Sequence, residues 1–462
     1  MDRAARGVHL MQFLVSLVGF IIAVGLLVAV HEWGHFWVAR KLGVKVLRYS
    51  IGFGRPLRSW RRGETEYVIG SLPLGGYVKM LDGREGPVDP SEAHRAFDRQ
   101  PVGKRSAIVA AGPAANLIFA VIAYALMYMV GVTGVAPILE VPSDSTPAAQ
   151  AGLQAEAEVL EVNGHPVHTF DALRVAVLDV ATGDQPIQLR VSEHGIERTV
   201  ELPGAPYGLL QSQEDPLAQL GLRPWEPRGG IVVRRIEEGG AASLAGLQVD
   251  DIVTGSEGVP FDRASALVQA IRQQPGERLE LDILRDGQPL TVSLLPATRR
   301  QDGEVTGYIG AAFGIDVPDE VRARLLVVER FGPLEALQAA AERTWDMSVL
   351  SLRVMGKMLT GEASLETISG PLGIADVAGR SLMFGLAAFL SFLALVSLSL
   401  AILNLLPVPV LDGGHLLFYL IEVLRGRPLS DQAQMLAQRI GMSLLLALMA
   451  LALFNDLTRL FF

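Results

Sequence analysis

The chain has 462 residues, half of them hydrophobic, with a net charge of -9 and a mean hydropathy of +0.34. This composition is too apolar for an ordinary soluble protein and indicates a membrane protein that also carries soluble domains. The charge gives no sign of a nucleic-acid partner, and the absence of cysteine excludes disulfides, thiolate metal sites and cysteine nucleophiles.

The first apolar segment covers residues 10–30 and contains no charged or histidine side chain. About 20 apolar residues suffice to cross the hydrocarbon layer of a bilayer, so we predict a membrane span that continues as a helix to about Ala39. No small-residue cleavage site precedes the polar end of this segment, which favours an uncleaved span over a signal peptide. Residues 1–9 are interpreted as an N-terminal extension, with Met1 and Met11 as alternative start positions.

The span ends in HEWGH, an H-E-x-x-H motif at 31–35. Positions i and i+4 share one face of a helix, so His31 and His35 can both direct an imidazole nitrogen at one metal ion. Glu32 projects close to that ion without binding it, and it can move a proton from water held there to a leaving amine. Two imidazoles, a third protein ligand and one open position favour a single zinc ion. Ionisable groups at membrane depth are costly, so their presence here indicates a functional site. The alternative is a helix end at the membrane surface whose polar residues are solvated.

The segment after the first span contains SIGFG at 50–54 and LPLGGYVKM at 72–80. Short apolar runs interrupted by glycine predict strands near the site that pair with an extended substrate; a purely structural hairpin is the alternative. The predicted substrate contacts are Gly52, Phe53, Gly54, Gly75, Gly76 and Tyr77. Lysine and arginine are abundant near both ends of this segment, which places it in the cytoplasm.

Three further spans are predicted at 106–132, 381–406 and 440–455, the last being short. With the first loop in the cytoplasm, four spans place both termini and the long segment between the second and third spans on the opposite side.

The long segment contains an internal repeat, AGLQAEAEVLEVNG at 151–164 and AGLQVDDIVTGSEG at 245–258. Each copy is followed by a helical stretch and two alternating runs typical of a hairpin, at 187–202 and 279–294. The pattern predicts two tandem β-rich domains. The repeats resemble bacterial PDZ domains, which bind extended peptides at a sheet edge; packed β-domains without a ligand groove are the alternative.

An amphipathic helix is predicted from about 331 to 359, and one apolar stripe along it contains Leu334, Leu337, Ala341, Trp345, Val349, Leu352, Met355 and Leu359. A helix packed on a β-rich domain and a helix lying on the membrane surface are equally compatible with that stripe.

The stretch NLLPVPVLDGGHLLF at 404–418 follows the third apolar segment. Pro407 and Pro409 cannot continue a regular helix, and they free backbone groups within the membrane region. Asp412 is then a carboxylate at membrane depth that needs a partner, which a zinc ion on the two histidines would supply. Asp412 is the predicted third ligand, with His415 as the competing candidate.

HExxH in the first span, N-x-x-P-x-P-x-L-D-G after the third, and PDZ-like repeats between them resemble the site-2 protease family of intramembrane zinc metalloproteases, in its bacterial form. The resemblance implies zinc ligands His31, His35 and Asp412, the general base Glu32, and a substrate-holding Asn404. It also implies intramembrane cleavage of single-span proteins in the bacterial inner membrane. The expected substrates are an anti-sigma factor, at its second cut in envelope-stress signalling, and remnant signal peptides. Two other functions are less compatible with these residues. A zinc transporter would not need Glu32 directly after a zinc-binding histidine. An inactive PDZ scaffold would not need to keep Glu32 together with all three predicted ligands.

The predicted fold is therefore a polytopic α-helical membrane protein with four transmembrane helices and two tandem PDZ domains between the second and third. The active site is expected near the cytoplasmic side, and the PDZ domains and both termini in the periplasm. The predicted divisions are 1–9, the extension; 10–135, spans one and two with HExxH and the cytoplasmic β-like loop; 136–225 and 226–315, the PDZ domains; 316–380, the connector with the amphipathic helix; and 381–462, spans three and four with the LDG motif.

Overall fold

The structure of the chain is a computed structural model. It describes residues 3–461 apart from 141, 143–144, 183–184, 203–208, 210–214, 228, 238, 262, 302–303 and 364–368. In this part of the chain, four helices are long and apolar enough to cross a membrane, as predicted. These stretches are Leu14–Lys41 in α1 (Arg3–Lys41), α2 (Val102–Val130), α11 (Leu386–Leu405), and Gln432–Thr458 in α13 (Asp431–Phe461).

The ends of these helices differ from the prediction: α2 runs from Val102 to Val130 rather than over 106–132, and three other differences follow. The third span begins at Leu386, because Gly385 adopts φ +105° and separates α11 from α10 (Pro371–Phe384), to which residues 381–384 belong. The fourth apolar helix extends beyond 440–455 at both ends. From residue 3 onward the predicted N-terminal extension is continuous with α1 and forms no separate element.

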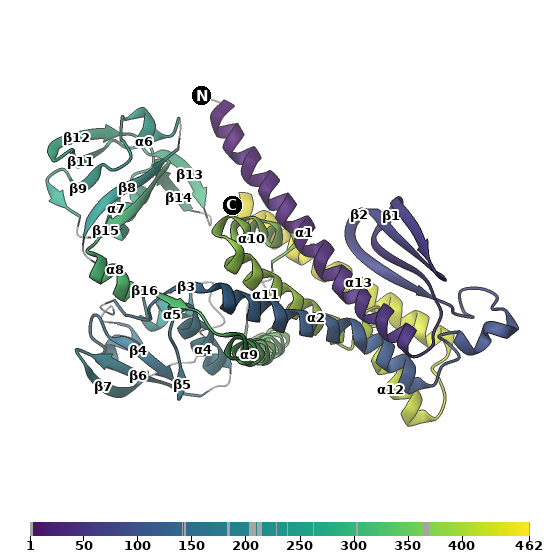
Figure 1. Ribbon diagram of the computed structural model, residues 1–462. Helices are drawn as coiled ribbons and strands as arrows, with labels where there is room; N and C mark the ends of the chain where they lie inside the picture. The colour runs from purple at the N-terminus through teal and green to yellow at the C-terminus, as the bar shows by residue number, and fades with distance from the viewer. Residues whose placement is uncertain are drawn as a thin grey trace.

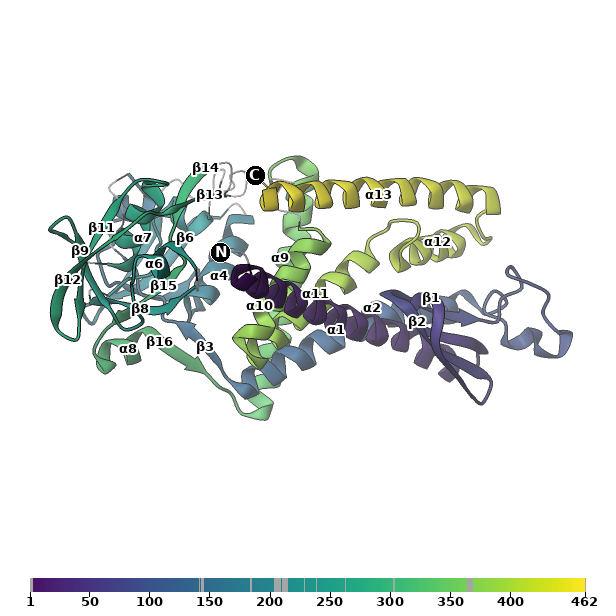
Figure 2. The ribbon, with the colours of Figure 1, turned by 90° about the horizontal axis from the view of Figure 1, so that it is seen from above.

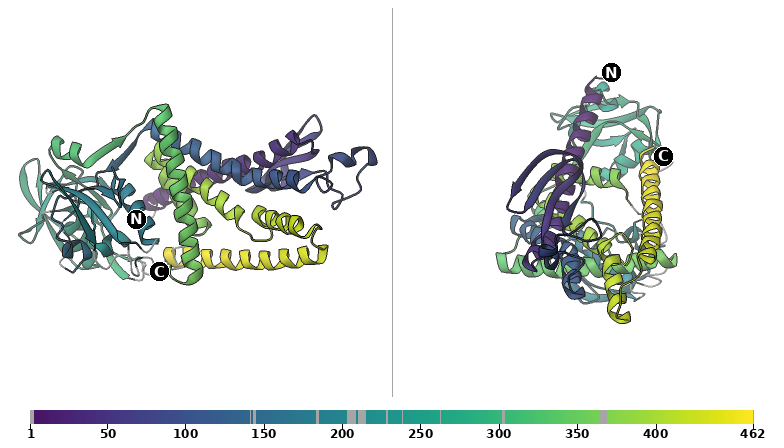
Figure 3. Two further views of the ribbon diagram at one scale, coloured as in Figure 1. Left: turned by 90° about the horizontal axis from the view of Figure 1, so that it is seen from below. Right: turned by 90° about the vertical axis from the view of Figure 1, so that its right-hand side faces the viewer.

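The helices form an elongated bundle with different structures at its two ends (Figures 1 and 2). α1 and α2 run side by side, and α11 packs along α2. α13 stands apart from α1 and α2 in both views of Figure 3. The β-rich domains lie at one end of the bundle, and β1, β2 and α12 (Asp412–Arg425) lie at the other.

β1 (Val46–Arg62) and β2 (Thr65–Met80) form one bent antiparallel hairpin, followed by the 3-10 helix η1 (Pro90–Arg95). Residues 46–51 of β1 pair with 76–80 on one side and with 66–69 on the other. Residues 58–62 pair back on 65–69, so the hairpin has four strand segments. Within the described chain, 76–80 is therefore an edge of this sheet. The predicted strands are confirmed, and they do form a structural hairpin with each other.

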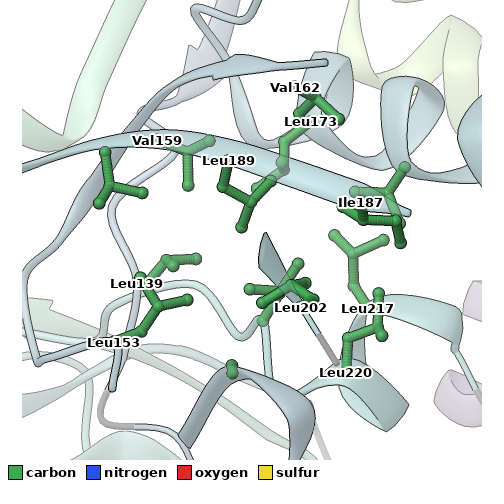
Figure 4. Close-up of a cluster of buried hydrophobic side chains, with 14 of the residues drawn as sticks. Leu139, Leu153, Val159, Val162, Leu173, Ile187, Leu189, Leu202, Leu217 and Leu220 are labelled. Atoms are coloured by element: carbon green, nitrogen blue, oxygen red, sulfur yellow. The ribbon is translucent and has the colours of Figure 1, made fainter. Parts of the chain in front are cut away.

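The first β-rich domain has a four-stranded sheet in the order β5-β4-β6-β7. Apolar side chains alternate along its strands and meet those of α4 in a closed core that includes Leu139, Leu189 and Leu217 (Figure 4). The predicted hairpin at 187–202 is confirmed. The elements are α3 (Pro147–Gln150), β4 (Glu158–Val162), β5 (His165–Pro166), α4 (Phe170–Thr182), β6 (Ile187–Glu193), β7 (Ile196–Leu202) and α5 (Pro216–Leu220).

The second β-rich domain repeats this plan with the order β12-β11-β9-β8-β15 and β10 paired on β9. The hairpin predicted at 279–294 is confirmed, with Asp286 and Gly287 both at positive φ in its turn. The elements are β8 (Gly230–Ile236), α6 (Ala241–Leu244), β9 (Ile252–Ser256), β10 (Val259–Pro260), α7 (Ala264–Gln273), β11 (Leu279–Arg285), β12 (Gln288–Leu294), β13 (Ala297–Gln301), β14 (Glu304–Tyr308) and β15 (Ala311–Asp316).

The chain enters and leaves the β-rich domains side by side. β3 (Val132–Val135), directly after α2, pairs antiparallel with β16 (Leu326–Glu329), which follows α8 (Asp319–Leu325). α9 (Pro333–Thr360) then crosses the ends of the bundle helices (Figure 3).

α9 contacts both the membrane helices and the first β-rich domain. Ala336 and Ala340 are buried on α2, and Arg353 forms an ion pair with Asp179 of α4 at 2.8 Å. The predicted helix and its packing on a β-rich domain are thus confirmed. Trp345, on the apolar stripe, is nevertheless 70% exposed. A large exposed apolar side chain of this kind is expected where a helix lies on a membrane surface.

Candidate active site

The HEWGH motif lies on the last turns of α1, where the helix meets α2 very closely. A Cβ built on Gly34, the fourth residue of the motif, would lie 2.2 Å from the carbonyl oxygen of Ala111 on α2. The two backbones therefore approach to a distance that only glycine permits. This approach buries His35 between the helices, at 9% exposure.

Asp412 reaches the two histidines from a break after α11. Helix α11 ends at Leu405, and the turn at 406–411 leads to Asp412, the first residue of α12. A Cβ on Gly413 would lie 2.2 Å from the carbonyl oxygen of Leu406, and one on Gly414 would lie 2.4 Å from that of Val408. These two glycines let the turn fold back tightly on the start of α12, so that Asp412 faces α1.

The three side chains meet at a single point. Nε2 of His31 lies 3.1 Å from Oδ2 of Asp412 and 3.2 Å from Nε2 of His35. Nε2 of His35 lies 3.5 Å from the same carboxylate oxygen. One ligand atom from each residue lies within 4.8 Å of the others, and His415 does not belong to this group.

These distances fit a zinc ion. A tetrahedral site with metal–ligand bonds near 2.0–2.1 Å places neighbouring ligand atoms roughly 3.3 Å apart, which is the range found between the three residues. Oδ2 of Asp412 is buried, and apart from its close contacts with the two imidazole Nε2 atoms it has no hydrogen-bond partner within the described chain. Such an atom is costly unless a cation or a donor meets it, so the donor set fits a bound metal.

The second nitrogen of each histidine has its own partner. Nδ1 of His35 lies 2.8 Å from the carbonyl oxygen of Ile108, so it donates a hydrogen and leaves Nε2 free for a metal. The amide of Asn116 lies 3.3 Å from Nδ1 of His31 through Nδ2, while its Oδ1 is buried without a partner in the described chain. Turning this amide over would let Oδ1 accept from Nδ1 of His31. Both imidazoles would then present Nε2 to the metal.

Gly112 on α2 makes room for both imidazole rings. A Cβ at this position would lie 2.2 Å from Nε2 of His35 and 2.8 Å from Cε1 of His31. Any larger residue would occupy the space of the ligand atoms themselves. The absence of a side chain at 112 is therefore part of the site.

The three residues and Glu32 line one cavity of about 400 Å³. Gly76 of β2 passes directly over Glu32, since a Cβ at 76 would lie 2.9 Å from Cγ of Glu32. The cavity is bordered by Gly76, Tyr77, Val78 and Met80, which belong to the edge segment of the β1–β2 sheet. A polypeptide paired with that edge would lie beside Glu32 and the three ligand atoms.

The structure brings together only part of the predicted substrate contacts. Gly76, Tyr77 and Asn404 line the cavity, and the amide of Asn404 donates to the carbonyl of Leu400 at 2.9 Å. The other four predicted contacts lie farther along the hairpin and do not line the cavity: Gly52, Phe53, Gly54 and Gly75. Phe53 stacks on Tyr77 with ring centroids 6.1 Å apart. His415 is a wall residue of the cavity rather than a member of the metal group.

Two residues of the site, Gly112 and Asn116, were not predicted. Both lie within the uncharged apolar segment that was interpreted as a span. A signal for Asn116 was present, because an amide at membrane depth needs a partner. Gly112 carries no comparable signal, since glycine is common in membrane helices.

The profile of peptidase family M50 matches residues 19–448 of this chain. The chain is 43% identical over 457 residues to "Regulator of sigma-E protease RseP" of Escherichia coli, covering 98% of this chain and 100% of that protein. It is 42% identical over 458 residues to "Protease RseP" of Yersinia pestis, with the same coverage. It is 41% identical over 464 residues to "Putative zinc metalloprotease RSc1411" of Ralstonia nicotianae, covering 97% and 99%.

Proposed function

This chain belongs to peptidase family M50 and is a zinc metalloprotease, and from that premise we propose that it cleaves a peptide bond inside the membrane segment of single-span proteins. The observation that carries this proposal is the position of the metal group. His31 and His35 lie on an apolar helix able to cross a membrane, and Asp412 lies directly after another. A protease that acts on soluble chains would have no need to place its ligands there.

We assign His31, His35 and Asp412 as the ligands of one zinc ion and Glu32 as the general base. Bound zinc supplies a Lewis acid that lowers the pKa of water and polarises the substrate carbonyl. Glu32 takes the proton of the attacking water and passes it to the nitrogen of the departing amine. Ile108 and Asn116 hold the two imidazoles in orientation through their second nitrogens.

The edge segment 76–80 is proposed to hold the substrate as an added strand. A membrane helix hides its peptide groups in internal hydrogen bonds, so it must unwind before a carbonyl can be attacked. A free sheet edge beside the cavity offers those groups new partners. Asn404 lines the same cavity and is proposed to bind the same extended segment.

The substrate class is taken from the similarity to proteases that are named regulators of sigma-E. We propose an anti-sigma factor that is cut in its membrane segment after a first cut outside, in the bacterial inner membrane. Remnant signal peptides present the same chemistry, a single apolar helix with a free end, and form a second proposed class.

The β-rich domains are proposed to be PDZ domains on the periplasmic side, with both termini there and the β1–β2 hairpin in the cytoplasm. The two lie at opposite ends of the bundle (Figure 2). Single cysteines at exposed Val259 and Arg61 of this cysteine-free chain test the arrangement with an impermeant maleimide. Labelling of residue 61, but not of 259, from the periplasm would refute it.

The deciding experiment compares wild type with Glu32→Gln on a single-span substrate in vesicles, with zinc measured in the same preparations. Glu32→Gln should keep zinc and give no product cut inside the membrane, because Glu32 moves protons and does not bind metal. Glu85→Gln, which removes a carboxylate at the rim of the same cavity, is the matched control and should cleave. Full cleavage by Glu32→Gln would refute the mechanism.

A further inference from the structure

Helix α13 touches the turn that carries Asp412 at one glycine. A Cβ built on Gly441 would lie 1.9 Å from the carbonyl oxygen of Pro409 and 2.9 Å from its carbonyl carbon. The contact is with backbone, so no flexible side chain can move aside. To admit a methyl group, α13 and the turn would have to separate by roughly 1 Å.

The touched turn is strained. Val410, the residue after Pro409, has φ +118°, a conformation that β-branched residues avoid and that persists only where the surroundings impose it. Gly413 and Gly414 hold the turn against the start of α12, as described above. Gly441, on α13, contacts the same turn at the backbone of Pro409. Asp412 follows Val410 by two residues, so movement of this turn moves the ligand.

No described residue of α13 lines the cavity of the site. The helix stands apart from α1 and α2 (Figures 2 and 3). Near its other end, the carboxylate of Asp456 accepts hydrogen bonds from the backbone amides of Gly370, Leu372 and Gly373 at 2.8–3.0 Å. These bonds tie α13 to the start of α10. Asp456 thus holds α13 against α10, and Gly441 lies against the turn that precedes Asp412.

We infer that Gly441 is a positioning residue of the protease: its close contact with Pro409 holds the strained turn in the conformation that directs Asp412 at His31 and His35. The inference rests on the proposed ligand role of Asp412. It assigns the fourth span a part in metal binding although none of its described residues lines the cavity of the metal group. The chemistry required of residue 441 is the absence of a side chain.

The test measures zinc retention against a chelator, and cleavage, in purified full-length protein. Gly441→Ala should lose zinc at a chelator concentration about tenfold lower than wild type and lose about tenfold in kcat, since residues that orient a ligand affect metal affinity by 10–100-fold. Gly25→Ala on α1 is the matched control, because a Cβ there meets nothing within 4 Å. It should stay within about twofold of wild type.

A double-mutant cycle with Val410→Gly separates positioning from general damage. Glycine at 410 is relaxed at positive φ, so the turn can yield to the added methyl group while Asp412 stays in place. The zinc loss caused by Gly441→Ala should be at least about threefold smaller in the Val410→Gly background. If Gly441→Ala alone does not accumulate, recovery of folded, zinc-loaded protein in the double variant supports the coupling, and failure to recover it contradicts the coupling.

The two proposals fail in different ways. Wild-type zinc retention and activity in Gly441→Ala, or an additive cycle, would overturn the positioning role while Asp412→Ala still lost zinc. Zinc retained in Asp412→Ala would instead overturn the ligand assignment itself.

Discussion

Gly112→Ala is the sharpest test of the metal group, because it adds one methyl group where the ligand atoms lie. The new carbon would stand 2.2 Å from Nε2 of His35 and 2.6 Å from Cε1 of the same ring. His35 cannot swing away freely, since Nδ1 is bonded to the carbonyl of Ile108 at 2.8 Å and the side chain is buried.

The size of the effect follows from these distances. A normal contact requires the His35 ring to move roughly 1 Å, whereas a zinc ligand tolerates displacements of only about 0.2 Å. The variant must therefore give up one ligand or break the contact between α1 and α2. We expect zinc affinity to fall about 100-fold or more, equivalent to about 2.8 kcal/mol, together with loss of cleavage.

Zinc affinity is measured by competition with a chromogenic chelator, and cleavage on a single-span substrate in the same vesicles. Gly103→Ala is the control on the same helix, because a Cβ there meets nothing within 4 Å. Wild-type zinc affinity and cleavage in Gly112→Ala would show that the histidines do not bind metal in the arrangement described.

Three further outcomes are expected. Asp412→Ala should lose bound zinc and His415→Ala should keep it; the reverse result in metal analysis would exchange their roles. Val78→Pro, on the strand edge beside the cavity, should slow cleavage with zinc retained by removing a backbone donor; Ser59→Pro on the opposite edge is the control, and equal effects would argue against substrate pairing. Arg285→Ala should destabilise the second β-rich domain by about 2 kcal/mol at neutral pH, because it removes two hydrogen bonds of 2.7 Å to the buried carboxylate of Asp251 and leaves the one from the Gln248 amide. Burial opposes ionisation of Asp251, but the bonds from Arg285 and the Gln248 amide outweigh it and lower its pKa. The stabilisation is thus present above the pKa that Asp251 has in the unfolded chain, and it is lost as pH falls below about 4. Amide exchange rates in β9 and β11 should therefore differ between variant and wild type at pH 7 and become equal in acid.

Local patterns in the sequence were enough to predict most of the helices and strands and a zinc-dependent protease. Apolar length predicts the four spans, alternation and an Asp-Gly turn predict the hairpins, and helical spacing places His31 and His35 on one face. Each of these depends on interactions between residues close in the chain, which a sequence displays directly. The break between α10 and α11 was missed because Gly385 lies in a continuous apolar run, where hydropathy does not report a change of φ.

The assembly of the site was decided by tertiary structure. Asp412 was preferred over His415 from the cost of a buried charge, but only the fold shows which of them meets the histidines. Gly112 leaves room for the imidazole rings of His31 and His35, and Gly441 lies against the backbone of Pro409; both neighbours are distant in the chain, and a glycine carries no side chain from which such a contact can be predicted. The edge proposed to bind substrate was likewise set by pairing within the hairpin, which leaves 76–80 unpaired on one side in the described chain and covers 46–51 on both sides. Composition and spacing specify which groups can bind zinc, while the close approach of helix backbones decides which of them face one another.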